Sequence, residues 1–163
     1  MKLVIAGASG YVATECIRQA LTDPRFTKVV ALARREVKVP TDLATRVDTS
    51  KFHSVVIEDY GSYSDEVKRE LAGADACVWT VAVTPNKASS YEWAEVVRVS
   101  RDVALEGLKV LLDVRGEEHA PMPLRFMYMS GNNAERDQTK SPLLMKKMCL
   151  MRVSSIHRLF DQY

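Results

Sequence analysis

Residues 2–13 read Lys-Leu-Val-Ile-Ala-Gly-Ala-Ser-Gly-Tyr-Val-Ala, a short apolar run followed by a glycine-containing loop. The run Lys2–Ala6 contains β-branched residues and ends at a glycine, which predicts a strand buried on both faces of a parallel sheet. From Tyr11 to Leu21 the apolar residues recur with helical spacing, and Asp23-Pro24 closes the segment. We therefore predict a strand, a tight loop over Gly7–Gly10 and a helix.

The loop has the composition of a phosphate-binding turn. Gly7 allows the tight turn, and Gly10 lets the backbone approach a pyrophosphate, whose charge the free N–H groups and positive end of the helix would stabilise. Ala13 takes the third glycine position, where close packing of helix on strand is the requirement. An ordinary glycine turn is the alternative. Because strand, loop and helix agree, we interpret the unit as Rossmann-type and dinucleotide-binding.

The rest of the chain alternates strand and helix signals. A cap at Ser62 or Ser64 with Asp65 and Glu66 in the first turn predicts a helix at Ser62–Leu71. Helical spacing predicts a long helix from Ser89 onward, although Lys109–Val114 alone also suits a strand. The polar stretch Glu36–Ser50 reads as a loop. Buried apolar runs predict further strands at Lys28–Ala33, Phe52–Ile57, Asp75–Val83 and Leu124–Ser130. This order predicts an α/β fold: a doubly wound parallel sheet of about five strands, helices on both faces, in one domain over residues 1–163.

Composition excludes several classes of protein. The chain of 163 residues is 47% apolar and 27% charged, as in ordinary globular proteins. Its net charge of +2 is small and its basic residues are scattered, so we expect no nucleic-acid or membrane partner. The cysteines and histidines lack metal-ligand spacing, so we expect no metal site, and the odd cysteine count suits a reducing cytoplasm. These residues are Cys16, Cys77, Cys149, His53, His119 and His157.

The residues at the end of the second predicted strand indicate which dinucleotide the chain prefers. A cofactor without a 2′-phosphate is usually held there by an acidic residue, whereas this chain reads Ala33-Arg34-Arg35. Two guanidiniums suit a phosphate by charge and geometry, so NADPH is favoured over NADH. A solvated basic turn is the alternative for this pair. Asp59, just past the third strand, could accept a hydrogen bond from the adenine amino group, although aspartate in this position is more often a cap.

Several segments together resemble the atypical short-chain dehydrogenases. More narrowly, residues 1–148 resemble fungal NAD(P)-binding-domain proteins related to NmrA-like and Tat-interacting-protein-like reductases. The segments are Gly7–Gly10, Ala31–Arg35, Asp75–Trp79, Phe126–Gly131 and Glu135–Ser141. The resemblance implies a Rossmann fold, NADP(H) binding, a catalytic-serine position at Ser130, and a nicotinamide half that lies along Thr80, Val81 and Ala82. The other residues predicted to bind the cofactor lie after the first two strands. They are Gly7, Ser9, Gly10, Tyr11, Val12, Arg34 and Arg35.

The chain also departs from this family. Short-chain dehydrogenases use a tyrosine with a lysine four residues later, and none of the six tyrosines, including Tyr11 with Glu15 at that offset, has one. Lys146 or Lys147 lies near the expected lysine, but both suit a solvated helix. Ser130 could equally be a turn residue. Because the chain stops at Tyr163, we expect a shortened substrate-binding part, with His157 at the surface.

Three functional hypotheses follow. The first is an NADP(H)-dependent oxidoreductase acting on a small carbonyl or alcohol, with Ser130 orienting the substrate and the proton donor unidentified. The second is a non-catalytic regulator or sensor of the NmrA kind, suggested by the absent tyrosine–lysine pair. The third is a shortened relative whose exposed sheet would lead to a homo-oligomer. The substrate itself cannot be identified from the sequence.

Overall fold

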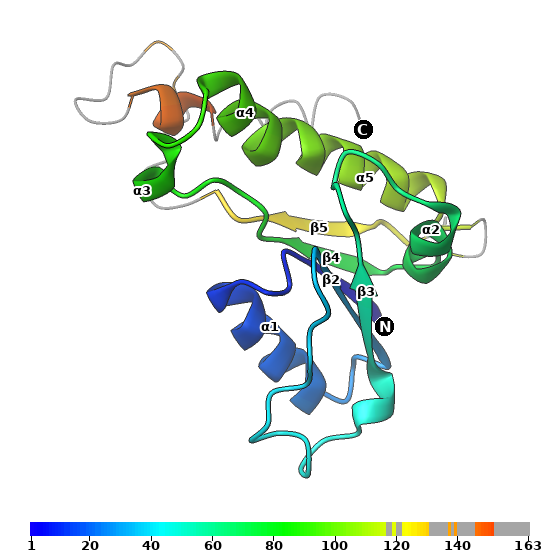
Figure 1. The fold of residues 1–163 in the computed structure, drawn as a ribbon. Helices are drawn as coiled ribbons and strands as arrows, with labels where there is room; N and C mark the ends of the chain where they lie inside the picture. Colours follow the sequence, from blue (N-terminus) through cyan, green and yellow to red (C-terminus); the bar gives the residue numbers. More distant parts are fainter. Residues whose placement is uncertain (117–118, 120–121, 131–136, 138, 140–145, 152–163) are drawn as a thin grey trace.

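The structure is a computed structural model that describes residues 1–116, 119, 122–130, 137, 139 and 146–151. Its centre is a five-stranded sheet in the order β3-β2-β1-β4-β5, and every neighbouring pair is parallel (Figure 1). The strands are β1 (Lys2–Ala6), β2 (Lys28–Ala33), β3 (Phe52–Val56), β4 (Ala76–Trp79) and β5 (Arg125–Tyr128). The predicted parallel α/β sheet of about five strands is confirmed.

Helices cover both faces of this sheet, as predicted. Helix α1 (Tyr11–Thr22) lies below it in Figure 1, while α2 (Asp65–Leu71), α4 (Trp93–Val97) and α5 (Val103–Asp113) lie above it. The remaining helical turns are α3 (Pro85–Ala88), the 3₁₀ turn η1 (Thr49–Lys51) and the π-helical turn η2 (Arg98–Asp102). The order of strands changes direction between β1 and β4, which is where open α/β sheets bind ligands.

The core consists of one apolar layer on each face of the sheet. Side chains alternate across a strand, so Leu3 and Ile5 of β1 pack with α1, whereas Val4 and Ala6 face α2 and α5. All four are almost completely buried. Strand β2 is buried in the same two-sided way, which explains why both central strands read as continuous apolar runs.

The fourth strand is shorter than predicted. It was expected to reach Val83 but ends at Trp79, because its partner strands end there: Trp79 pairs with Ala6 of β1 on one side and with Tyr128 of β5 on the other. The backbone N–H of Thr80 still donates to the Ala6 carbonyl over 3.0 Å. The chain then leaves the sheet, although its apolar composition continues, so the strand prediction was wrong beyond that point.

The predicted long helix is present but is not uniform. The short helix α3 precedes it, and the continuous run begins at Trp93 rather than Ser89 and ends at Asp113. The alternative of a strand at Lys109–Val114 is wrong, because that stretch belongs to α5 apart from its last residue. The π-helical turn η2 in the middle of the run was not predicted, since the apolar spacing continues through it.

The bounds of other elements differ from the predicted ones by a few residues. Helix α2 begins at Asp65 instead of Ser62, because the Ser64 side chain accepts a hydrogen bond from the Val67 N–H and forms the cap. Strand β3 ends one residue early and β5 is trimmed at both ends. The predicted turn after β5, most of the segment Glu135–Ser141, and His157 lie outside the described residues.

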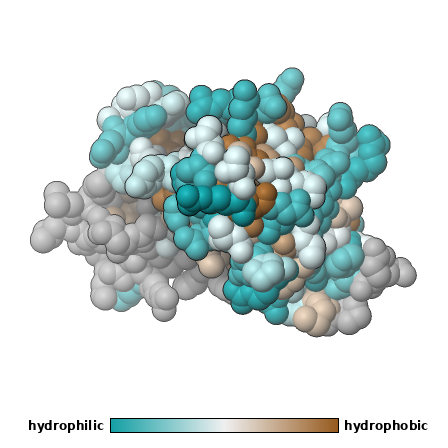
Figure 2. Space-filling model, turned by 90° about the horizontal axis from the view of Figure 1, so that it is seen from below, coloured by the Kyte–Doolittle hydropathy of each residue, from teal (hydrophilic) through white to brown (hydrophobic). Residues whose placement is uncertain are grey.

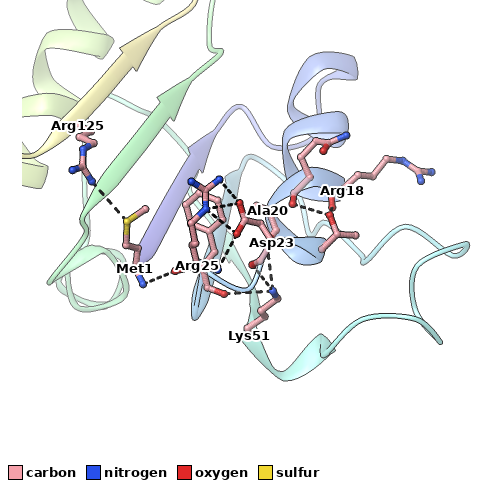
Figure 3. A network of polar contacts seen from close by, with 10 residues as sticks. Met1, Arg18, Ala20, Asp23, Arg25, Lys51 and Arg125 are labelled. Carbon is pink, nitrogen blue, oxygen red and sulfur yellow. Dashed lines mark hydrogen bonds and ion pairs between the residues drawn. The ribbon is translucent and has the colours of Figure 1, made fainter.

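A network of hydrogen bonds lies at the end of the sheet opposite the glycine loop. The Lys51 ammonium of η1 lies 3.3–3.4 Å from the carbonyl oxygens of Ala20, Asp23 and Phe26, at the end of α1 (Figure 3). A cation there stabilises the negative end of the helix dipole. The N-terminal ammonium of Met1 donates to the Arg25 carbonyl over 2.9 Å in the same network.

Seen from below in Figure 1, the molecule presents a mainly hydrophilic surface in which apolar residues form small, separate patches (Figure 2). Among the described residues, no helix combines the length and the apolar character needed to cross a bilayer. The compartment and the self-association expected from the sequence stay predictions.

Candidate functional site

A cavity of about 590 Å³ lies at the carboxyl end of the sheet. It is formed by the segments that follow β1, β2, β3 and β4, and it is closed on one side by the α3–α5 region. Its lining residues are Gly7, Ser9, Gly10, Arg34, Glu58, Asp59, Tyr60, Thr80, Val81, Ala82, Val83, Thr84, Lys87, Tyr91, Glu95, Arg98, Val99 and Val103. The cavity therefore occupies the position that the change in strand order selects.

The conformation of Gly7 shapes the floor of this cavity. Its φ is +80°, a left-handed backbone angle that favours glycine. A Cβ at this position would lie 2.5 Å from Thr80 Oγ1 and 3.2 Å from the Val81 nitrogen. The Thr80 hydroxyl in turn donates to the Ala6 carbonyl over 2.8 Å. The glycine thus lets the loop after β1 pass directly against the segment after β4.

Tyr60 holds the glycine loop from the other side. Its hydroxyl donates to the Leu32 carbonyl over 3.0 Å and accepts from the Gly7 N–H over 3.1 Å, which links the loop to β2. Burial raises the pKa of this phenol, so it stays neutral and keeps donating. Sequence reasoning considered Tyr60 only as a potential proton donor. Its structural role depends on a contact 53 residues apart, which no local pattern predicts.

The helix after the loop is open to a ligand at its amino end. Gly10 is the N-cap of the 12-residue helix α1, and no side chain caps it among the described residues. The first N–H groups of a helix have no intrahelical acceptor and attract anions. Ser9 and Gly10 line the cavity at this point. The loop therefore fits a pyrophosphate group, which would bind these N–H groups.

Of the two arginines after β2, the structure brings one to the cavity. Arg34 is exposed and lines it; Arg35 is also exposed but does not. Neither forms an ion pair with a carboxylate within the described part of the chain. The Arg34 guanidinium is thus available to an anion at the β2 end of the cavity.

Asp59 is held in an ion-pair network on the cavity wall. Its carboxylate accepts from the Gly61 N–H over 2.9 Å and pairs with Arg98 Nη1 at 3.3 Å. These two contacts, the Gly61 hydrogen bond first, lower the pKa of Asp59. Arg98 also makes two hydrogen bonds to Glu95, of 2.8 and 2.9 Å. The Asp59 carboxylate, predicted to accept from adenine, thus has contacts within the protein as well.

The other predicted site residues fall into two groups. Thr80, Val81 and Ala82 line the cavity as a loop beyond β4 rather than as part of a strand. Tyr11, which is 95% exposed, and Val12 are not among the residues that line it. Ser130, half-buried just beyond β5, and the exposed Lys146 and Lys147 are also absent from the described lining.

Two cavity residues that the sequence pattern missed, Tyr91 and Lys87, could take part in proton transfer. In the described part of the chain the cavity is lined by two tyrosines, Tyr60 and Tyr91, and the Tyr60 hydroxyl is already bonded to the Leu32 carbonyl. Tyr91 is 51% exposed, and no described residue binds its hydroxyl. Lys87 also lines the cavity, four residues before Tyr91 along consecutive turns. The search pattern missed this pair because it required the lysine after the tyrosine.

A larger hollow, of about 820 Å³, lies along the outer edge of β3. Its lining runs from Glu36 to Val39 and along β3 to α2, and it contains none of the predicted cofactor residues. It also lies away from the strand ends at which α/β sheets bind ligands. The smaller cavity is therefore the candidate site, in spite of its size.

No protein-family model and no curated protein sequence matches this chain. Solved structures do match it in fold. The PhqB reductase domain from Penicillium fellutanum is 15% identical with a TM-score of 0.68, over 99% of this chain and 45% of that one.

Two further matches are nucleotide-sugar enzymes. UDP-glucuronic acid 4-epimerase from Bacillus cereus, a point variant in complex with UDP-4-deoxy-4-fluoro-glucuronic acid and NAD, is 17% identical with a TM-score of 0.61 over 99% of this chain and 52% of that one. ADP-L-glycero-D-manno-heptose-6-epimerase from Helicobacter pylori is 15% identical with a TM-score of 0.62, over 99% and 51%. The chain thus has the Rossmann fold of these proteins and spans about half of their length.

Proposed function

We propose that this chain binds NADP(H) in the cavity at the carboxyl end of the sheet and is an oxidoreductase acting on a small carbonyl or alcohol. The observation that carries the proposal is the convergence of three features on one cavity: the Gly7–Gly10 loop, the uncapped start of α1, and the exposed guanidinium of Arg34. The structural matches, whose names include reductases and NAD complexes, support the cofactor class.

The strand order gives the bound dinucleotide a direction. Arg34 follows β2, the glycine loop follows β1 and Thr80 follows β4, and these strands are consecutive in the sheet. A 2′-phosphate on Arg34 and a pyrophosphate at the start of α1 put the adenosine half at the β2 end. The nicotinamide half then extends toward Thr80–Ala82. The substrate would enter beside it, next to the α3–α5 region.

Tyr91 is the proton donor in this proposal. When bound, the nicotinamide supplies the hydride that attacks the carbonyl carbon. The Tyr91 hydroxyl would donate its proton to the carbonyl oxygen, and Lys87 is the cationic side chain that lines the cavity nearest to it in sequence. Both residues line the cavity beyond Thr84, on the side where the substrate would lie. Ser130, as predicted from the resemblance, would orient the substrate.

Titration calorimetry with NADPH and NADH tests the cofactor assignment. Wild-type protein should bind NADPH more tightly. Arg34→Gln should weaken NADPH by about 10- to 100-fold and leave NADH nearly unchanged, because a charged hydrogen bond to phosphate is lost. Arg35→Gln is the matched control, since it removes an adjacent exposed arginine that does not line the cavity. Equal affinity for the two nucleotides would contradict the NADP(H) assignment.

Turnover separates the oxidoreductase from the non-catalytic sensor. The sensor would bind NADPH equally well but oxidise none of it with any member of a broad panel of aldehydes, ketones and nucleotide sugars. Reduction of one panel member at a steady rate, absent in boiled protein, supports the enzyme. Binding without turnover across the whole panel would favour the regulator instead.

A further inference from the structure

The π-helical turn η2 is hydrogen-bonded to the loop after β4 and to the end of β5. It interrupts the helical run between α4 and α5 at Arg98–Asp102. Such turns are rare and often occur at functional sites, because they change the direction of side chains and free backbone groups. In this protein the turn places Arg98 at the cavity wall and turns Ser100 inward.

Ser100 joins three segments that are distant in sequence. Its side chain is fully buried, with 0% exposure, and its Oγ accepts a hydrogen bond from the Val83 N–H over 3.0 Å. Its carbonyl accepts a hydrogen bond from the Tyr128 hydroxyl at the end of β5 over 2.5 Å. One residue of η2 is therefore bonded both to the loop after β4 and to the last residue of β5.

The loop after β4 depends on such an anchor. Its first residue, Thr80, is still bonded to Ala6 of β1. Beyond it the chain has left the sheet, and Thr80 to Thr84 all line the cavity. Val83 is buried, so its N–H requires an acceptor, and Ser100 Oγ supplies it. The loop is thus held at both ends while its middle, Val81 and Ala82, faces the cavity.

We propose that Ser100 is a positioning residue that fixes the Thr80–Thr84 loop against the nicotinamide half of the cofactor. The inference rests on the proposed function, because the strand order assigns this loop to that half. Ser100 does not line the cavity and acts through Val83. In the proposed orientation the adenosine half would lie toward β2, away from this loop. Loss of the serine hydroxyl should therefore weaken a whole dinucleotide but not a ligand that contains only the adenosine half.

The experiment compares NADPH with 2′,5′-ADP by calorimetry on the full chain. Ser100→Ala leaves the Val83 N–H without its acceptor and should weaken NADPH by about tenfold. Binding of 2′,5′-ADP should change by less than about twofold. Ser100→Thr, which keeps a hydroxyl, should restore most of the NADPH affinity.

Ser54→Ala is the matched control. Ser54 Oγ also accepts a backbone hydrogen bond, from Val37 N–H over 2.8 Å, but beside β3 and away from the cavity. It should lower stability without changing the ratio of the two affinities. Amide hydrogen exchange gives a readout without nucleotide: the Val83 amide should exchange faster in Ser100→Ala and not in Ser54→Ala.

The results of these experiments either support or overturn the positioning role of Ser100. If Ser100→Ala does not fold, Tyr128→Phe, which removes the other bond to the same residue, should lower NADPH affinity selectively to a smaller extent. If the available variant weakens both ligands equally, or neither, Ser100 has no positioning role and the inference is overturned while the proposed function stands. If the wild-type protein binds neither ligand, the proposed function fails, and the inference fails with it.

Discussion

The two sides of the cavity are built in different ways. The glycine-loop side, Gly7–Gly10 with Arg34, is continuous with the first two strands and offers mainly backbone groups. The far side, Thr80–Thr84 with η2, is assembled by side-chain contacts such as Val83 to Ser100 and Arg98 to Asp59, which join residues 17 and 39 positions apart. A backbone site can be encoded in a dozen consecutive residues, whereas a site made of side chains requires the whole fold.

The strongest test of the glycine-loop side is Gly7→Ala. The substitution forces an L-residue to φ +80° and puts a Cβ 2.5 Å from Thr80 Oγ1. The left-handed conformation alone costs about 1–2 kcal/mol, and the overlap must push the loop away from β4. We expect NADPH affinity to fall at least about 100-fold, since both halves of the cavity are displaced. Calorimetry and chemical denaturation measure the two effects.

Gly116→Ala is the control for backbone strain. Gly116 also has a left-handed φ, of +84°, but lies after α5. It should lose similar stability from strain and retain NADPH binding. Unchanged binding in Gly7→Ala would show that the loop does not contact the cofactor, and the contrast between the two sides would disappear.

The sequence predicted the glycine-loop side of the cavity better than the far side. The strands Lys2–Ala6 and Lys28–Ala33 were predicted to the residue, because each is buried on both faces and ends at a clear break in composition. The loop Gly7–Gly10 and Arg34 were placed at the cavity for the same local reasons. Asp75–Val83 was overextended, because the end of a strand is set by where its neighbours end, and apolar composition does not carry that information.

The far side could be predicted only in part. Thr80 to Ala82 were identified through a resemblance, but Ser100 and the π-helical turn were not, and on the glycine-loop side Tyr60 was missed in the same way. Tyr60 and Ser100 act through hydrogen bonds to residues 17 to 53 positions away, which leave no periodic trace in the sequence. Ser130 was singled out instead through the same resemblance, because it matches the family's catalytic-serine position at the end of the fifth strand.

Tyr91→Phe examines the chemistry of the far side. The variant loses one hydroxyl that no described residue binds. Its free energy of unfolding should therefore match that of the wild type, and its NADPH affinity should differ from the wild-type value by less than about twofold. Turnover of a carbonyl substrate identified by screening should fall about 100-fold, the usual effect of removing a general acid. Lys87→Met should reduce turnover less. If Tyr91→Phe retains full activity, the proton comes from another group, and the far side contributes binding alone.

Gly107→Ala tests how the far side is supported, with the smallest expected effect. Alanine normally stabilises a helix interior over glycine by about 1 kcal/mol. In α5, however, a Cβ at Gly107 would overlap the six-membered ring of Trp79, the last residue of β4, and would lie 3.0 Å from the Tyr63 hydroxyl. Overpacking of this kind costs about 1–3 kcal/mol, so after the helix gain of about 1 kcal/mol we expect a net loss of about 0–2 kcal/mol in the free energy of unfolding.

Trp79→Phe in the Gly107→Ala background should recover part of that loss, because the smaller ring leaves room for the methyl group, and a double-mutant cycle would measure the coupling. Displacing α5 also displaces η2, so Gly107→Ala should weaken NADPH by several-fold and 2′,5′-ADP by less, since η2 reaches the adenosine end only through the Arg98–Asp59 pair. A stability gain in Gly107→Ala would mean that α5 lies farther from β4. The far side would then not depend on this contact, and the side-chain network around Ser100 alone would have to hold it.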